Sequence, residues 1–565
     1  MRRTRARQRR RDRGSGFGLI TITHSYRTHA PEVTKRIKDI QEAFGVGLVK
    51  SKEFPIFKNF KVRIRPGDIV YITGRSGSGK STLLRLLAEH FGRDKVATLD
   101  DVKIDPDKAI VDQIGRDTQE AIKLLSMVGL AEPWVWARRY SELSEGQKYR
   151  FRLAKLLESH KPILIVDEFA STLDADTAKV VAYNFARAAR RMGKTVILAT
   201  TREDLKDDLR PNIYIHKDIE PGEVEVEYDE HPDTSQGCSI AELVRVEPGT
   251  KADWEKLKEF HYRSHKLPPP KAIFRAVYNG KTIGVIVYSS CFPATKGRVQ
   301  AVGYKPSIEE LNREWARISR VVIHPAYRGI GLGAKLVRES LKLAAKMGIR
   351  HVETTAAMAR YNPFFEKAGM KKIMTVEPDE SVKRACERLR ALGLEPALLA
   401  DREYVLDRLK HMSKAELDKV REALAEVKPV YGRALLGSGR AYMRKEEYMR
   451  ALSQLGLEEL AKVLSKLAEL ASPKIYLYWC AKWLKEERAK EKPTMADIRA
   501  RMRQRPIRAV LADLQAKAPI APSVEEWLKR PQVWDLPGVD TPGTPHKLMV
   551  EIGGREVEIK ERGNR

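Results

Sequence analysis

Two glycine-rich segments of this chain could hold phosphate groups. Residues 74–82 read GRSGSGKST, and residues 328–333 read RGIGLG. An apolar run precedes each segment, and apolar residues spaced three and four apart follow it. Glycines allow backbone N–H groups to close around an anion at the N-terminus of the following helix. We therefore predict two separate phosphate-binding sites on one chain.

The first segment has the Walker A pattern GxxxxGKS between a predicted strand and a predicted helix. We expect Lys80 to contact the β- and γ-phosphates of a nucleotide and Ser81 to coordinate Mg²⁺. The position between strand and helix argues against a chance glycine-rich turn. The predicted nucleotide-binding residues of this loop are Gly74, Ser76, Gly77, Gly79, Lys80, Ser81 and Thr82.

Two adjacent carboxylates follow a short apolar run at residues 163–166. Such a run is typical of a buried parallel strand. Carboxylates at the end of a buried strand are costly unless a cation or a reaction needs them. We therefore predict that Asp167 holds Mg²⁺ and that Glu168 polarises the attacking water.

Two further motifs extend this pattern. The sequence LSEGQ at residues 143–147 resembles the LSGGQ signature of ABC-type ATPases, with Glu145 in place of the first glycine. The sequence STLD at residues 171–174 resembles the D-loop of that family. The four motifs follow one another along the chain in the order of that family, which makes residues 19–215 similar to ABC ATPases. The resemblance implies ATP and Mg²⁺ as ligands. It also implies a head-to-tail homodimer, in which Ser144 and Gly146 of one subunit contact the γ-phosphate held by the other.

The chain departs from this family at two positions. Thr201 stands where the family has a switch histidine, so we expect hydrolysis to be slow or differently gated. Gln113 is the best candidate for the Q-loop glutamine. The stretch from Lys80 to Ser144 is short for a transporter cassette, which favours a soluble ABC protein of the kind found in repair or translation.

The second glycine-rich segment follows ISRVVIHP at residues 318–325, and residues 362–370 read NPFFEKAGM. Together these segments make residues 238–376 resemble the GNAT family of acetyltransferases. The resemblance implies acetyl-CoA as a ligand, with the backbone of Val321 and Val322 near the thioester. It also implies a cradle for the pyrophosphate, made by the loop residues Arg328, Gly329, Gly331 and Gly333.

The catalytic residues of this second site are less defined. Phe365 stands where many GNAT enzymes have a tyrosine, so Tyr361 is our candidate for the catalytic acid. Glu314 is a candidate general base, because a carboxylate near an amine is the usual requirement. Each also has an ordinary explanation, Tyr361 as a packing residue and Glu314 as a surface charge. The candidates for contacts with the acceptor are His261, Tyr262 and His265.

Composition narrows the partners and the compartment. The 565 residues include 105 Lys and Arg against 76 Asp and Glu, a formal net charge of +29. This excess favours a polyanionic partner, usually RNA or DNA. The four cysteines form no CxxC pair, which fits a reducing cytoplasm. No apolar run approaches the ~18 residues of a membrane span.

The pattern along the chain predicts an α/β protein with a mostly helical C-terminal region. We expect a basic disordered tail (1–18), an ABC-type ATPase domain (19–220), a linker (221–237), a GNAT domain (238–376) and a mostly helical region with a terminal hairpin (377–565). Residues 476–508 combine aromatic and basic side chains, which suits unpaired bases. An amphipathic helix with its aromatics in the core is the alternative for this segment.

These features lead to one leading hypothesis and two alternatives. The leading one is an ATP-dependent acetyltransferase that moves acetyl from acetyl-CoA to an amine on RNA, tRNA in particular. The ATPase would clamp or remodel the RNA. One alternative is a GNAT protein acetyltransferase gated by ATP. The other is a non-catalytic soluble ABC protein that binds nucleic acid or ribosomes, which Phe365 supports and the intact RGIGLG loop opposes.

Overall fold

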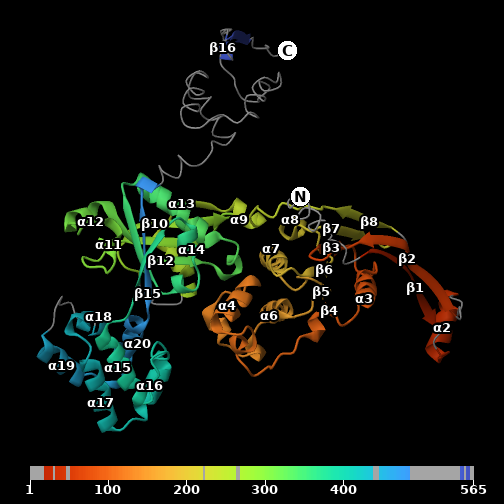
Figure 1. Ribbon diagram of the computed structural model, residues 1–565. Coiled ribbons are helices and arrows are strands. Elements are labelled where there is room, and N and C mark those ends of the chain that lie inside the picture. Colours follow the sequence, from red (N-terminus) through yellow and green to blue (C-terminus); the bar gives the residue numbers. More distant parts are fainter. Residues whose placement is uncertain are drawn as a thin grey trace, which may run out of the picture. The chain divides into compact units, whose positions relative to one another are not determined.

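The computed structural model describes residues 18–29, 32–45, 51–220, 223–261, 267–436, 444–483, 548–552 and 555–559 (Figure 1). The chain divides into two compact units, Met1–Trp479 and Cys480–Arg565. In the second unit, β16 (Leu548–Ile552) and β17 (Arg555–Ile559) form the predicted antiparallel hairpin. The predicted tail at residues 1–18 lies outside the described residues, except for Gly18.

The first sheet is the core of the N-terminal domain. Its strands, in spatial order, are β4 (Val96–Ala97), β5 (Ile163–Val166), β6 (Thr195–Ala199), β3 (Ile69–Thr73), β7 (Ile213–Lys217) and β8 (Val224–Tyr228). The first five are parallel, and β8 pairs with β7 antiparallel. Every residue of β3, β5 and β6 is buried, as expected for central parallel strands. Part of the predicted linker thus forms the edge strand β8.

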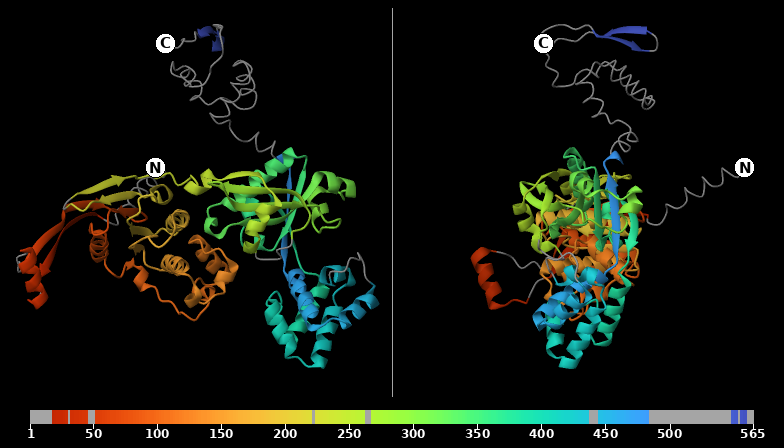
Figure 2. Two further views of the ribbon diagram at one scale, coloured as in Figure 1. Left: turned by 180° about the vertical axis from the view of Figure 1, so that it is seen from behind. Right: turned by 90° about the vertical axis from the view of Figure 1, so that its left-hand side faces the viewer.

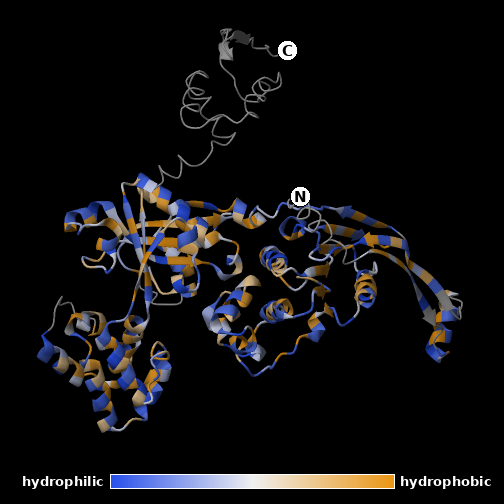
Figure 3. Cartoon of the chain, viewed as in Figure 1, coloured by the Kyte–Doolittle hydropathy of each residue, from blue (hydrophilic) through white to orange (hydrophobic). Residues whose placement is uncertain are grey.

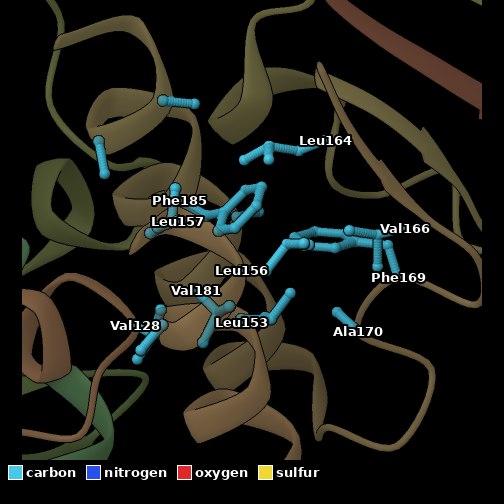
Figure 4. Packing of buried hydrophobic residues seen from close by; sticks show 14 of the residues in the cluster. Val128, Leu153, Leu156, Leu157, Leu164, Val166, Phe169, Ala170, Val181 and Phe185 are labelled. Carbon is cyan, nitrogen blue, oxygen red and sulfur yellow. The ribbon is translucent and has the colours of Figure 1, made fainter. Parts of the chain in front are cut away.

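Helices cover both faces of this sheet. They are α3 (Lys80–Phe91), α4 (Thr118–Met127), α5 (Pro133–Trp136), α6 (Glu145–Glu158), α7 (Ala175–Arg191) and α8 (Lys206–Leu209). α3 packs on the face that carries Val70 and Ile72. α4, α6 and α7 pack on the opposite face, where Phe185 and Leu156 meet Val166 (Figure 4). Packing on both faces holds the strands in place, and with them the loops that follow the carboxyl ends of β3 and β5.

A long hairpin precedes this sheet in the sequence. β1 (Leu19–His29) pairs antiparallel with β2 (Ser51–Arg63). The helix α2 (Lys35–Phe44) comes between the two strands in the sequence and lies at the far end of the hairpin (Figure 2). Phe57 and Val62 of β2 are buried against the α3 side of the sheet. The hairpin therefore belongs to the hydrophobic core of the ATPase domain at the end where Ile20 of β1 pairs with Val62 of β2.

The second sheet has seven strands. In spatial order they are β14 (Lys371–Val376), β15 (Lys474–Cys480), β13 (His351–Ala356), β12 (Trp315–Ile323), β11 (Lys281–Ser289), β10 (Pro270–Tyr278) and β9 (Arg245–Pro248). The predicted hairpin of β10 and β11 is confirmed, and Asn279 and Gly280 at its turn have positive φ angles of 46° and 74°. The helices of this domain are α9 (Ser239–Leu243), α10 (Lys251–Leu257), α11 (Arg298–Val302), α12 (Ile308–Glu314), α13 (Leu332–Lys346) and α14 (Phe364–Lys367).

The two central strands of this sheet separate part of the way along. β12 and β13 are parallel, and they pair only over residues 315–317 and 351–353. Both strands continue past these residues, to Ile323 and Ala356. The sheet is therefore open between the C-terminal halves of β12 and β13, beside the loop at residues 328–333. We call this opening the splay.

A helical segment interrupts the second sheet between β14 and β15. It contains α15 (Glu380–Ala391), α16 (Arg402–Lys410), α17 (Lys414–Ala425), α18 (Gly432–Leu436), α19 (Lys445–Ser453) and α20 (Leu457–Ala471). These helices share a hydrophobic core of their own, and Figure 3 shows hydrophobic and hydrophilic residues interspersed along them. The mostly helical C-terminal region is thus confirmed, and much of it is an insertion into the sheet.

The strand β15 decides between our two interpretations of the aromatic residues in 476–508: these residues belong to the core, but in a strand and not in a helix. Tyr476, Tyr478 and Trp479 are at most 4% exposed and lie in the sheet between β13 and β14. They are core residues, so they are not available for stacking on bases. Residues 484–508 lie outside the described residues. The second sheet therefore includes one strand from residues 377–565, the region that the sequence predicts to be mostly helical.

Candidate phosphate-binding sites

The loop at residues 74–82 wraps around its own lysine. Lys80 Nζ donates hydrogen bonds of 2.7 Å to the carbonyl oxygens of Gly74 and Arg75. Burial lowers the pKa of Lys80, and the nearby Glu168 and Asp167 carboxylates oppose this shift. The ammonium group is thus held inside the loop, with the two predicted acidic residues close by.

Close packing and a left-handed backbone conformation explain two glycines of this loop. Gly74 has a φ of +138°, and a Cβ atom there would lie 2.0 Å from the carbonyl oxygen of Lys217. Gly79, the N-cap of α3, has a φ of +101° and offers no side chain to the first N–H groups of that helix. The Ser78 Oγ atom is buried and has no hydrogen-bond partner among the described residues. Free donors around a compact loop fit a nucleotide phosphate.

The two carboxylates follow β5 on a strained turn. Glu168 and Ala170 have positive φ angles of 51° and 57°, which are uncommon for residues other than glycine. The backbone N–H of Glu168 donates to Asp167 Oδ1 at 2.9 Å. Asp167 and Ser81 offer the oxygen ligands that Mg²⁺ prefers, so these residues fit the ion.

The remaining motifs of the first domain surround the same turn. Ser144 is the N-cap of α6, and its Oγ accepts from the Gln147 N–H. A Cβ on Gly146 would lie 3.4 Å from Leu173 in the D-loop segment. Arg202, which sequence reasoning missed, donates from Nη1 to the carbonyl oxygen of Leu173 at 2.9 Å. Signature, D-loop and switch segments are therefore in contact.

Two other predicted residues have different surroundings. Gln113 donates from Nε2 to the carbonyl oxygens of Asp105 and Lys108, and its Oε1 accepts from Asp105 N–H. Its amide therefore stabilises a local loop. Thr201 is exposed, and the preceding Thr200 is fully buried at the end of β6.

The second loop also opens a helix without a side-chain cap. Gly331 is the N-cap of α13 and has a φ of +87°, and Gly329 has a φ of +89°. The first N–H groups of α13 are thus available to an anion beside the splay. The side chain of Arg328, which we expected in the pyrophosphate cradle, has other partners. Its guanidinium donates to the carbonyl oxygens of Ile323, Phe260 and Ala131, so only its backbone remains for a ligand.

The residues that we predicted for acyl transfer lie at different positions along β12 and after β13. Val321 and Val322 lie on β12 beyond its last pairing with β13, with Val322 buried. Tyr361 is 48% exposed after β13, and Phe365 is a buried packing residue. Glu314 precedes β12 at the closed end, where it pairs with Arg313 and Arg350. The hydrogen bond from Arg313 lowers the pKa of Glu314, which makes it a weaker base.

The acceptor candidates are only partly described. His261 is buried and its ring packs edge-on against Trp254. Tyr262 and His265 lie outside the described residues.

A buried polar cluster at the base of the splay escaped sequence reasoning. Glu353, at the last paired position of β13, accepts hydrogen bonds from Arg298 at 2.7 and 3.0 Å and from the Tyr476 hydroxyl at 2.8 Å. The side chains of Arg298 and Glu353 are only 4% and 1% exposed. Because the three residues are distant in sequence, no local pattern could predict their contact.

Fold and loops together define an ATPase domain joined to an acyl-CoA-binding domain, and comparisons with known proteins agree. Residues 57–109 match the family model described as "ABC transporter", and residues 239–370 match "Acetyltransferase (GNAT) family". The aliphatic sulfonates import ATP-binding protein SsuB of Yersinia pestis bv. Antiqua is 31% identical over 199 residues, which cover 31% of this chain and 69% of that protein. SsuB 3 of Pseudomonas savastanoi pv. phaseolicola is 36% identical over 193 residues, or 29% of this chain and 66% of that protein.

The chain therefore belongs to the ABC ATPase family and carries a GNAT acetyltransferase domain. It spans just under two thirds of the length of several of these relatives. A solved ATP-binding cassette in a post-hydrolysis state with ADP and Pi covers 38% of this chain and 98% of its own, with 19% identity and a TM-score of 0.28. The match to a bacterial Atm1-family ABC exporter with ATP bound covers 30% of this chain and 36% of the exporter chain, with 20% identity and a TM-score of 0.26.

The two families use ATP with Mg²⁺ and acetyl-CoA, and the residues described above fit these ligands. Both are families of enzymes. In the part of the chain that the structure describes, no helix has the length and apolar character needed to cross a bilayer.

Proposed function

We propose that the protein is an ATP-dependent acetyltransferase that moves acetyl from acetyl-CoA to an amine on RNA, with tRNA as the first candidate. One contact carries the ATP dependence. Arg328, the first residue of the RGIGLG loop, donates from Nη1 to the carbonyl oxygen of Ala131 in the ATPase domain at 2.8 Å. The loop that would hold acetyl-CoA is thus attached to the domain that would bind ATP.

The proposed ATPase site lies at the carboxyl ends of the parallel strands β3 and β5. Lys80 binds the β- and γ-phosphates, and Ser81 and Asp167 hold Mg²⁺. Glu168 orients the attacking water. Ser144 and Gly146 of a second copy complete the site in a head-to-tail homodimer, as in the ABC family.

The proposed transferase site lies at the splay. Acetyl-CoA, when bound, supplies an activated acetyl group. The N–H groups of Gly331 and Gly333 hold its pyrophosphate, and the backbone of Val321 and Val322 orients the thioester. Tyr361 protonates the leaving thiolate after the acceptor amine attacks the carbonyl carbon. The amine proton passes to water, because the carboxylate of Glu314, our candidate base, is ion-paired outside the splay.

The excess of basic residues supports RNA as the acceptor. The chain has 105 Lys and Arg against 76 Asp and Glu, and residues 2–13 alone read RRTRARQRRRDR. Such charge binds phosphate backbones and attracts them over a distance. We infer a cytoplasmic location, because the four cysteines form no CxxC pair.

The test uses radiolabelled acetyl-CoA with total tRNA or with total cell protein, each with and without ATP. We expect label in tRNA only when ATP is present, and none with the Lys80→Ala variant. Label in protein alone would replace the RNA proposal by an ATP-gated protein acetyltransferase. ATP-independent labelling would refute the coupling, and binding of acetyl-CoA without any transfer would indicate a sensor.

A further inference from the structure

The two domains also touch through one carboxylate of the ATPase. The Tyr327 hydroxyl donates a 2.7 Å hydrogen bond to Asp176 Oδ2, and the Tyr278 hydroxyl lies 3.4 Å from Asp176 Oδ1. Asp176 is in the first turn of α7, directly after the D-loop segment. Tyr327 is the residue before Arg328, which begins the RGIGLG loop. The contact therefore joins the residues next to two functional loops.

The same helix approaches the loop a second time. A Cβ atom on Gly329 would lie 2.6 Å from Asn184 Nδ2 and 3.3 Å from the Ser126 carbonyl oxygen. Asn184 is 5% exposed, and its Nδ2 has no hydrogen-bond partner among the described residues. Only a glycine at position 329 permits this approach. α7 is thus packed directly against the backbone of the RGIGLG loop.

A short hydrogen-bonded segment connects Asp176 to the predicted site of ATP hydrolysis. Ser171 N–H donates to the Glu168 carbonyl oxygen at 3.1 Å, and Leu173 N–H donates to that of Ala170 at 3.2 Å. Asp174 then caps α7 by accepting from the Thr177 N–H at 3.0 Å. A change in the backbone at Glu168 can therefore reach α7 within two consecutive turns.

The signature and switch segments contact this same connection. The Ala170 N–H donates to the Tyr149 hydroxyl of α6 at 2.8 Å, and Arg202 donates to the Leu173 carbonyl oxygen. The left-handed backbone of Glu168 and Ala170 shows that the surrounding contacts hold the turn in an uncommon conformation. Three segments of the nucleotide site thus converge on the chain that leads to Asp176.

We propose that Asp176 and Tyr327 are positioning residues that couple nucleotide binding to acetyl-CoA binding, an inference that rests on the proposed function. ATP fixes the segment from Glu168 to Asp174, and the Asp176–Tyr327 hydrogen bond transfers this order to the RGIGLG loop. A loop that is ordered before binding loses less freedom when acetyl-CoA binds. The two ligands therefore bind with positive cooperativity, and each raises the affinity for the other by the same factor.

The test measures acetyl-CoA affinity of the full-length protein by calorimetry, with and without a non-hydrolysable ATP analogue and Mg²⁺. In the wild-type chain we expect the analogue to tighten acetyl-CoA binding by about fivefold or more, the lower end of typical coupling. In Tyr327→Phe we expect this factor to fall to about two or less, because only the Arg328–Ala131 hydrogen bond remains. The acetyl-CoA affinity of the nucleotide-free protein should be unchanged. Asp176→Ala removes the acceptor instead of the donor and should give the same result.

A matched control removes a different tyrosine hydroxyl from the same domain. The Tyr288 hydroxyl bonds to Ser340 Oγ within the GNAT domain, so Tyr288→Phe should keep the full coupling factor. A thermal unfolding midpoint like that of the wild type verifies that each variant folds. No coupling in the wild type, or equal coupling in wild type and Tyr327→Phe, would overturn the inference.

This result is separable from the proposed function because binding requires no acceptor. Coupling with no transfer to RNA would leave the inference intact and refute the RNA acceptor. ATP-dependent transfer to RNA, together with coupling that is retained in Tyr327→Phe, would support the RNA acceptor and refute the inference about Asp176 and Tyr327.

Discussion

Lys80 is the residue on which nucleotide binding depends most directly. Its ammonium group bridges two carbonyl oxygens at one end of the loop and is close to Asp167 and Glu168. We expect Lys80→Ala to weaken ATP binding by at least ~3 kcal/mol, or roughly a hundredfold, because charge-assisted bonds to phosphate are lost. Calorimetric titration with ATP and Mg²⁺ measures this. The control is Lys58→Ala, an exposed lysine of β2, which should bind normally.

The buried pair of Arg298 and Glu353 makes a prediction about stability. Removal of one partner leaves a charge that is buried without compensation. We expect Arg298→Met to lower the free energy of unfolding by about 3–5 kcal/mol. Adding Glu353→Gln to this variant should restore most of the loss, which denaturant titration can follow. A loss of less than about 1 kcal/mol in the single variant would mean that water reaches Glu353.

Single residues also show where sequence reasoning ends. The cradle around Lys80 could be predicted because its residues are consecutive and the loop pattern is local. The partners of Arg328 could not, because they are carbonyl oxygens from Ala131 and Phe260 that only the folded chain brings together. The sequence also could not show that Glu314 lies at the closed end of the sheet. That position depends on which end of β12 pairs with β13.

At the scale of elements, the N-terminus of α13 is the proposed anion site. Gly331→Glu would put a carboxylate where a pyrophosphate should bind, and we expect loss of measurable acetyl-CoA binding. Gly348→Glu, near the other end of α13, is a matched control. Both glycines have nearly the same φ, +87° and +88°, and no described atom lies within 4 Å of a Cβ at either position. The control carries equal backbone strain and charge, so it should bind acetyl-CoA normally.

Elements with a strong local pattern were predictable from sequence. The apolar run at 163–166 is β5, and the turn at Asn279 and Gly280 joins β10 to β11. β15 was not predictable, because aromatic residues followed by a basic run are equally typical of a nucleic-acid surface. Its partners, β13 and β14, precede it by an entire helical insertion. Pairing over such a distance leaves no trace in the local pattern.

At the scale of the molecule, the GNAT sheet depends on a strand that follows the helical insertion. We compare two truncated chains that both begin at residue 1, one ending at residue 473 and one at residue 483. The shorter chain lacks β15, so β13 and β14 lose their shared neighbour and the core side chains of Tyr476 and Trp479. We expect it to lose acetyl-CoA binding and the cooperative unfolding of the GNAT domain. Circular dichroism during heating measures this, and the longer chain should behave like the full protein in both respects.

The position of β15 also sets an order of events during synthesis. β14 leaves the ribosome well before β15, and the whole helical insertion is translated between them. At about 5–20 residues per second, the unfinished sheet waits roughly five seconds or more with a strand missing beside β13. The insertion has its own core and can fold in that interval, which brings the ends of the gap closer together. The nascent chain therefore exposes an open sheet edge for a defined time, during which a chaperone would have its best opportunity to bind.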